Sequence, residues 1–325
     1  MQNFNYVKAD SLDFAVEALG VGDGTSILAG GTDLVPLMKD ELATPNTLID
    51  ISGLDDLNYV EERDGKLHIG ATTPLSDLAA NPILAARYSA LAEACRLAAT
   101  PQLRNMSTIA GNLLQQPRCW YYRGEHNCWL KGGELCYARN GENELHAIFL
   151  NSPPESRCVS VHPSDPAVAL LLFDAVVRFR TGDGESETPI GDFYDRPTPE
   201  RRNSVVLPAG AVITEIVLEA VTGRSTYLKA MPRASWAFAL ASVGIALQVA
   251  DGRVEDARVS LGGVAPVPLR FPRVEALLEG QAVALLDADL LAEALVAEAT
   301  PLSKNGYKVP LLRGLFKQAL STLIG

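Results

Sequence analysis

The sequence lacks the features of a protein that binds nucleic acid or spans a membrane. It has no stripe of Lys and Arg interleaved with aromatic residues, and its formal net charge is -11 at pH 7. An acidic surplus repels a phosphate backbone, so we expect no nucleic-acid partner. No apolar run approaches the roughly 20 residues that a bilayer span needs, and we expect no membrane anchor. The first residues lack the apolar segment of an export signal, which favours the cytoplasm, although co-export with a partner chain would place the protein in the periplasm.

Several common catalytic and nucleotide-binding motifs are also missing. The chain contains neither the GxGxxG fingerprint of dinucleotide-binding folds nor the GxxxxGK[ST] sequence of P-loop proteins. Its four histidines stand in no Ser-His-Asp context, and we assign no catalytic acid or base. A stand-alone flavoenzyme would need such a base and a substrate pocket, so that class is disfavoured.

The patterns that are present indicate an α+β protein with an interruption. Residues 25–38 are typical of a strand, a glycine turn and a helix, and a hairpin is expected at Asp64-Gly65. Residues 74–99 predict two helices, and residues 226–265 predict a helix or buried segment followed by an antiparallel pair. From Pro117 to Pro163 no period is sustained, and a break of that length inside a compact domain is normally functional or disordered.

These patterns divide the chain into two parts. Residues 1–222 are expected to form one domain of mixed sheet and helices, with a cysteine-bearing insertion at about 117–160. Residues 223–325 are expected to form a smaller α+β domain, because the Thr-Gly-Arg sequence at 222–224 separates two patterned segments.

Three glycine turns are candidates for binding an anion. They lie at residues 28–34, 107–115 and 261–266. Glycine lets the backbone approach a phosphate closely and direct N–H groups toward it. Each turn alone also fits an ordinary structural role, for example with Thr32 or Asp33 capping the following helix.

The order of the motifs carries more information than any one of them. LAGGTDL, TIAGNLL, HPSDPAVALLLFDAVV, LPAGAVI and YLKAMPRASWAFALASVG follow one another in this order. In this order they resemble the FAD-binding medium subunit of the xanthine oxidase and carbon monoxide dehydrogenase family, from Phe4 to about the C-terminus. The resemblance implies an FAD-binding fold of two subdomains followed by a smaller C-terminal domain.

The resemblance also implies a set of cofactor-binding residues. The first glycine turn would wrap the pyrophosphate, the second would line the cofactor, an aspartate and a lysine would complete the pocket, and the main chain of one strand would contribute. Their positions in this sequence are Leu28, Ala29, Gly30, Gly31, Thr32, Asp33, Leu34, Thr108, Gly111, Asn112, Asp165, Ile213 and Lys229. Without the family match, Asp165 would be interpreted as a helix cap and Lys229 as a surface residue.

Four of the five cysteines are clustered, at Cys119, Cys128, Cys136 and Cys158. Their spacing matches neither a zinc finger nor a ferredoxin sequence, and by itself it identifies nothing. Two disulfides, a zinc site completed by His126 or His146, and a 4Fe-4S cluster all remain open on spacing alone. Cys95 lies in an alanine-rich apolar pattern and is interpreted as a packing residue.

Within the family, the position of the cysteines between TIAGNLL and HPSD resembles the branch whose medium subunit holds an additional 4Fe-4S cluster, and the local sequence is closer to bacterial aldehyde oxidoreductases than to 4-hydroxybenzoyl-CoA reductase. The resemblance implies four cysteine ligands, with Arg118 and Arg123 as candidate donors to sulfur.

The implied function is that of an electron-transfer flavoprotein subunit of a molybdenum-dependent aldehyde oxidoreductase. Electrons would arrive from a large subunit with the molybdenum cofactor by way of a small subunit with 2Fe-2S clusters. They would leave through FAD to an external acceptor. A 4-hydroxybenzoyl-CoA reductase-like or other molybdenum hydroxylase subunit is the alternative, and a zinc-stabilised scaffold without enzymatic activity is a remote one.

Overall fold

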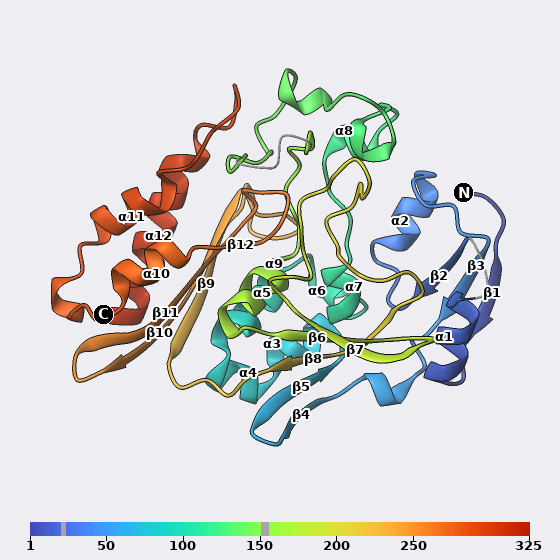
Figure 1. The fold of residues 1–325 in the computed structure, drawn as a ribbon, viewed down its shortest axis with the longest axis horizontal. Helices are drawn as coiled ribbons and strands as arrows, with labels where there is room; N and C mark the ends of the chain where they lie inside the picture. Colours follow the sequence, from blue (N-terminus) through green and yellow to red (C-terminus); the bar gives the residue numbers. More distant parts are fainter. Residues whose placement is uncertain (21–23, 151–155) are drawn as a thin grey trace.

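The computed structural model describes residues 1–20, 24–150 and 156–325. Three β-sheets with their covering helices follow one another, from the N-terminal sheet at one end of the molecule to the C-terminal sheet and its helices at the other (Figure 1). The α+β class expected from the sequence is therefore confirmed. Among these residues, no helix combines the length and the apolar character that a membrane span requires.

The N-terminal part is a parallel sheet with the strand order β1-β3-β2. Its elements are β1 (Asn5–Lys8), α1 (Leu12–Gly20), β2 (Thr25–Leu28), α2 (Leu34–Lys39) and β3 (Thr47–Asp50). Parallel neighbours need a crossover, which the two helices supply. Ala15 and Val16 of α1 pack with Ile49 of β3 in a small core. β2 ends at Leu28, directly before the glycine turn, as the sequence predicts.

The middle of the molecule is an antiparallel sheet with the order β4-β5-β8-β6-β7. Its strands are β4 (Val60–Arg63), β5 (Lys66–Gly70), β6 (Val176–Thr181), β7 (Gly184–Pro189) and β8 (Val212–Leu218). The predicted hairpin joins β4 to β5 through Asp64 and Gly65, whose φ angles of 51° and 79° suit a tight turn. At the start of β8, Val212 packs in the core of the first sheet and Ile213 in that of the second. The two sheets therefore meet there.

Several short helices accompany this second sheet, and most of their buried side chains pack in its core. They are η1 (Asp55–Leu57), α3 (Leu75–Ala80), α4 (Pro82–Arg87), α5 (Ser89–Leu97), α6 (Pro101–Arg104), α7 (Ile109–Leu113), α9 (Asp165–Leu170) and η4 (Leu171–Phe173). The prediction of two helices over residues 74–99 is wrong, because the chain forms three. Asn81 accepts hydrogen bonds from the backbone of Ile83 and Leu84 at 2.9 and 3.2 Å, and Pro82 follows it. This cap and proline end one helix and begin another.

The C-terminal part is an antiparallel sheet, β12-β11-β10-β9, covered by helices. It contains β9 (Arg224–Ala230), β10 (Ala241–Ala250), β11 (Arg253–Gly262), β12 (Leu269–Arg270), α10 (Pro272–Leu278), η5 (Val283–Leu285), α11 (Ala288–Val296) and α12 (Lys308–Ile324). The predicted antiparallel pair is confirmed as β10 and β11. The segment before it is the strand β9 rather than a helix, because β10 pairs with it along its length and buries Thr226 and Tyr227.

The cysteine-bearing segment contains little regular structure. Its elements are α8 (Trp120–Arg123), η2 (Trp129–Lys131) and η3 (Tyr137–Arg139). The insertion expected at about 117–160 includes residues 151–155, which lie outside the described residues.

Candidate functional site

A cavity of about 530 Å3 lies where β2 ends and β8 begins. Its size falls in the range of small-molecule and cofactor sites. Most of the residues expected to bind FAD line it, and they come from the first glycine turn, the second turn and β8: Leu28, Ala29, Gly30, Gly31, Thr32, Asp33, Leu34, Thr108, Gly111 and Ile213. The third glycine turn, at residues 261–266, follows β11 and does not contribute to this lining.

The first glycine turn is held closely against the second one. A Cβ atom on Gly30 would overlap the backbone carbonyl oxygen of Met106, so only glycine fits there. Gly31 has a φ of +67°, in the left-handed region that glycine adopts at no steric cost. The hydroxyl groups of Thr32 and Ser107 are 2.8 Å apart and bonded to each other. The backbone on this side of the cavity is thus preorganised for close approach of an anion.

Asp33 joins the glycine turn to the cysteine-bearing segment. Its carboxylate accepts hydrogen bonds from the guanidinium group of Arg123 at 2.9 Å and from the backbone N–H of Gln116 at 2.8 Å, and it forms an ion pair with Arg118 at 2.9 Å. Asp33 stands at the N-cap position of α2 but makes no capping hydrogen bond, so the interpretation as a cap is wrong. The expectation that Arg118 and Arg123 bond to sulfur is not met, because both bind Asp33 instead.

Three residues of the expected set lie outside the cavity lining. Asn112 accepts a hydrogen bond from the Ser164 hydroxyl at 2.6 Å, and Ser164 in turn caps α9 by accepting from the backbone of Ala167 at 3.1 Å. Asp165 is therefore not the cap of this helix, contrary to the expectation from its sequence alone. Its carboxylate is 2.7 Å from the ammonium of Lys229.

The ion pair of Asp165 and Lys229 is buried, with 6% and 1% of the two side chains exposed. The alternative view of Lys229 as a surface residue is wrong. Tyr227 donates its hydroxyl to Asp165 at 2.5 Å, and Lys229 also donates to the backbone oxygen of Leu97 at 3.1 Å. Burial raises the pKa of Asp165, and the Lys229 ammonium opposes that shift. The pair joins α9 to β9.

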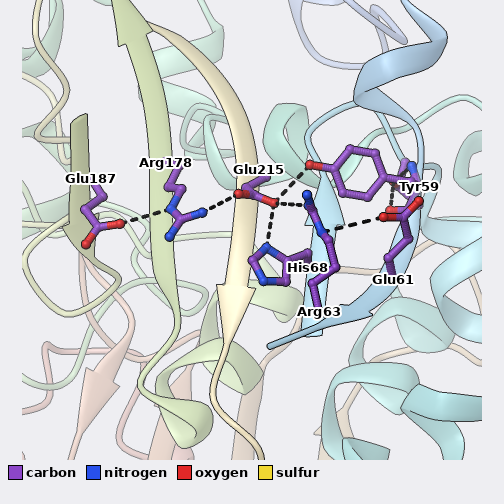
Figure 2. A network of polar contacts seen from close by, with 8 residues as sticks. Tyr59, Glu61, Arg63, His68, Arg178, Glu187 and Glu215 are labelled. Atoms are coloured by element: carbon purple, nitrogen blue, oxygen red, sulfur yellow. Dashed lines mark hydrogen bonds and ion pairs between the residues drawn. The ribbon is translucent and has the colours of Figure 1, made fainter. Parts of the chain in front are cut away.

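A polar network on the second sheet holds β8 in place beside the cavity (Figure 2). Glu215, two residues after Ile213, accepts hydrogen bonds from Tyr59 at 2.9 Å, His68 at 2.9 Å and Arg178 at 2.7 Å. Arg63 donates to it at 3.0 Å. Burial raises the pKa of Glu215, but the bonds from His68, Arg178 and Tyr59 outweigh it and hold the pKa below its ordinary value. This network ties β8 to both neighbouring strands.

The four clustered cysteines line one small cavity. Cys119, Cys128, Cys136 and Cys158 all face it, and the space left between the side chains is about 20 Å3, close to that of one water molecule. All five cysteines of the chain are free thiols, so the two disulfides are not formed in the described residues. Within that part of the chain, no group of three His, Cys, Asp or Glu residues is arranged to hold a metal ion. Cys95 is buried among apolar side chains, as expected of a packing residue.

Burial keeps two of these thiols in the protonated form. It raises the pKa of Cys119 to about 11 and that of Cys158 to about 12. The neighbouring cysteines make a smaller contribution to both upward shifts, because like charges repel. Formation of several thiolates in this space would need a positively charged centre to balance them.

The two histidines considered as zinc ligands differ in their surroundings. His126 is exposed, and its ring packs against those of Tyr121 and Tyr137 at 5.0 and 5.2 Å. His146 is buried, and its Nε2 lies 3.2 Å from the sulfur of Cys119. Burial, followed by the ammonium of Lys308, lowers the pKa of His146 to about 4, so its imidazole is neutral.

Tyr122 lines both cavities. It lies on α8, three residues after Cys119, and it stands between the glycine-turn cavity and the cysteine cavity. The two cavities therefore adjoin one side chain. Sequence reasoning missed this residue, because nothing in the pattern of residues 117–163 distinguishes one aromatic side chain from another.

Comparisons with known proteins show the family of the chain and its two domain types. Residues 2–218 match the family described as the FAD binding domain in molybdopterin dehydrogenase, and residues 226–323 match the CO dehydrogenase flavoprotein C-terminal domain. The chain is 36% identical to the aldehyde oxidoreductase FAD-binding subunit PaoB of Escherichia coli (strain K12), over 99% of this chain and 98% of that protein. It is 28% identical to the glyceraldehyde dehydrogenase medium chain of Sulfolobus acidocaldarius, over 84% and 79% of the two chains.

Among solved structures, the fold is similar to that of carbon monoxide dehydrogenase from Hydrogenophaga pseudoflava. The TM-score is 0.77 at 26% sequence identity, and the match covers 99% of this chain and 97% of that chain.

Proposed function

The chain belongs to the family of FAD-binding medium subunits of the xanthine oxidase and carbon monoxide dehydrogenase type, and on that premise we propose that it serves a molybdenum-dependent aldehyde oxidoreductase. The observation that carries the proposal is the position of Tyr122, which borders both the glycine-turn cavity and the four-cysteine cavity. Two redox centres in these cavities would be neighbours in one electron-transfer subunit.

The glycine-turn cavity fits FAD by its backbone. A Cβ would not fit at Gly30, and a residue with a side chain would be strained at Gly31. Both glycines therefore allow the main chain to approach a pyrophosphate. Thr108 and Ile213 also line this cavity. Bound FAD would supply the redox chemistry, while these residues bind and orient it.

Asn112, Asp165 and Lys229 complete the proposed cofactor-binding set from behind the lining. Asn112 holds the cap of α9, and the ion pair of Asp165 and Lys229 holds α9 against β9. We propose that these contacts keep the wall of the cavity rigid. We also propose a domain boundary between residues 222 and 223, because β9, the first strand of the C-terminal sheet, begins at Arg224.

The side chains around the cysteine cavity have the donor chemistry of an iron-sulfur cluster, and we propose that they move apart to admit one, because the space between them is only about 20 Å3. Cys119, Cys128, Cys136 and Cys158 are four thiols around one space, and none is used in a disulfide. A 4Fe-4S cluster takes four thiolate ligands, one for each iron. These residues would hold the cluster, which would supply one-electron chemistry beside the FAD site.

The proposed partners follow from the same function. A large subunit with the molybdenum cofactor would oxidise the aldehyde, and a small subunit with 2Fe-2S clusters would deliver the electrons to this chain. An external acceptor would receive them at the FAD site. Two relatives, an aldehyde oxidoreductase subunit and a glyceraldehyde dehydrogenase subunit, support an aldehyde as the substrate class.

Absorption spectra and metal analysis of the purified chain test the proposal. We expect flavin bands together with a broad iron-sulfur shoulder, both of which bleach on reduction. Cys128→Ser should lose iron and keep FAD, because the glycine turn is untouched. Cys95→Ala is the matched control: it removes an equally buried thiol outside the cysteine cavity and should keep both cofactors. A colourless protein with stoichiometric zinc, or full iron content in Cys128→Ser, would contradict the assignment.

A further inference from the structure

The side chain of His146 has an unusual position for a buried imidazole. It is 2% exposed, and its Nε2 is 3.2 Å from the sulfur of Cys119. Its other ring nitrogen, Nδ1, is also buried and has no hydrogen-bond partner in the part of the chain that the structure describes. Among the described residues, the imidazole ring therefore makes its polar contact with the sulfur of Cys119.

The ring is fixed in this position by the backbone on both sides. The backbone N–H of His146 donates to the backbone oxygen of Asn143 at 3.0 Å. The backbone carbonyl oxygen of His146 accepts from the side-chain amide of Asn305 at 3.1 Å. Both asparagines are fully buried. The indole of Trp120 packs edge-on against the imidazole, with the ring centroids 5.3 Å apart. Such support keeps the Nε2 atom directed at the sulfur.

The direction of the hydrogen bond follows from the chemistry of a ligated cysteine. An imidazole nitrogen donates a hydrogen bond only when it carries a proton, and a metal-bound thiolate carries no hydrogen and can only accept. In the loaded site, Nε2 therefore has to carry the proton for the contact to be a hydrogen bond. The alternative tautomer would place two lone pairs against each other.

We propose that His146 donates Nε2–H to Cys119 and thereby raises the reduction potential of the cluster at this site. A donor to sulfur withdraws charge from the thiolate and stabilises the more negative, reduced state. The inference rests on the proposed function, since it needs Cys119 to be a cluster ligand. It assigns His146 as a positioning and tuning residue that acts through Cys119, and not as a ligand.

Redox titration of the purified chain, followed by the EPR signal of the reduced cluster, tests this role. His146→Phe removes the donor and keeps an aromatic ring against Trp120. We expect its midpoint potential to shift to a more negative value at unchanged iron and FAD content. His146→Gln restores an N–H donor and should recover part of the shift. His126→Phe is the matched control, because this exposed histidine packs on aromatic rings and its side chain has no hydrogen bond to sulfur among the described residues.

Labelling separates this inference from a folding defect and from failure of the proposed function. In wild-type protein carrying 15N-histidine, pulsed EPR should detect nitrogen coupled to the reduced cluster, and His146→Gln should lose that coupling. An unchanged potential in His146→Phe with full iron, or no histidine coupling in the wild type, would overturn the role of His146 while leaving the cluster in place. Absence of iron from the wild type would instead refute the proposed cluster itself.

Discussion

Replacing Asp33 with asparagine should disturb both proposed cofactor sites through one side chain. The backbone of Asp33 belongs to the glycine turn, and its carboxylate binds Arg118, Arg123 and the backbone of Gln116 in the cysteine-bearing segment. Asparagine has nearly the same shape but no charge. The substitution leaves two guanidinium groups without their carboxylate, and it loosens the connection between the two cavities.

The structure sets the size of the effect. The Asp33 side chain is 14% exposed, and hydrogen bonds between charged groups contribute about 1.5–3 kcal/mol when they are shielded from water. Because asparagine still accepts one bond, we expect Asp33→Asn to lower the free energy of unfolding by about 2 kcal/mol. Asp195→Asn is the matched control: Asp195 pairs with Arg201 at 2.7 Å but is 64% exposed, so its loss should cost less than about 1 kcal/mol.

Urea unfolding and cofactor analysis measure the outcome. Asp33→Asn should raise the Kd for FAD about tenfold, equivalent to about 1.4 kcal/mol, and should also lower the iron content. Cys128→Ser, by contrast, should lower iron alone. Equal stability and equal FAD affinity in Asp33→Asn and Asp195→Asn would refute the claim that Asp33 couples the two sites.

Three further predictions concern Gly30, which lines the FAD cavity, and two polar contacts outside the lining. Gly30→Ala should abolish FAD retention on gel filtration because its Cβ would overlap a backbone carbonyl, whereas Gly191→Ala, in open space, should bind FAD normally. Lys229→Met should lower the free energy of unfolding in urea by about 3–5 kcal/mol, because it leaves Asp165 buried and unpaired; a loss below about 1 kcal/mol would contradict the ion pair. The pKa of Glu215 in the folded protein is below its ordinary 4.5. The contribution of Glu215 to the free energy of unfolding is therefore present above pH 4.5 and is lost as the pH falls through the folded pKa. Acid unfolding should therefore have a smaller pH slope below 4.5 in Glu215→Gln, and an unchanged slope would count against the network.

The sequence predicted the parts of the site that depend on local chain geometry. A glycine turn after a strand can be recognised because close backbone approach restricts the residue type, and Gly30 and Gly31 line the expected cavity. The hairpin at Asp64-Gly65 could be predicted because a tight turn also restricts the residue type, and the pairing of β4 with β5 confirms it. The clustering of four cysteines in one short segment likewise predicted a common site, and all four side chains line one cavity.

Long-range pairing explains what the sequence could not predict. Asp33 and Asp165 each stand where a helix begins, so local rules favour both as caps. The first instead binds arginines some 85–90 positions away, and the second binds Lys229, 64 positions away. Tyr122 has no sequence signal, because its role depends on two cavities that form only when distant segments pack. Local propensity is a weak guide wherever such tertiary contacts compete with it.

A reductive titration of the purified chain counts the electrons that one chain accepts. With FAD and one 4Fe-4S cluster bound, we expect about three electrons per chain, two for the flavin and one for the cluster. Cys128→Ser should accept about two under the same conditions. A wild-type chain that accepts only two electrons, with no iron lost during purification, would contradict the account.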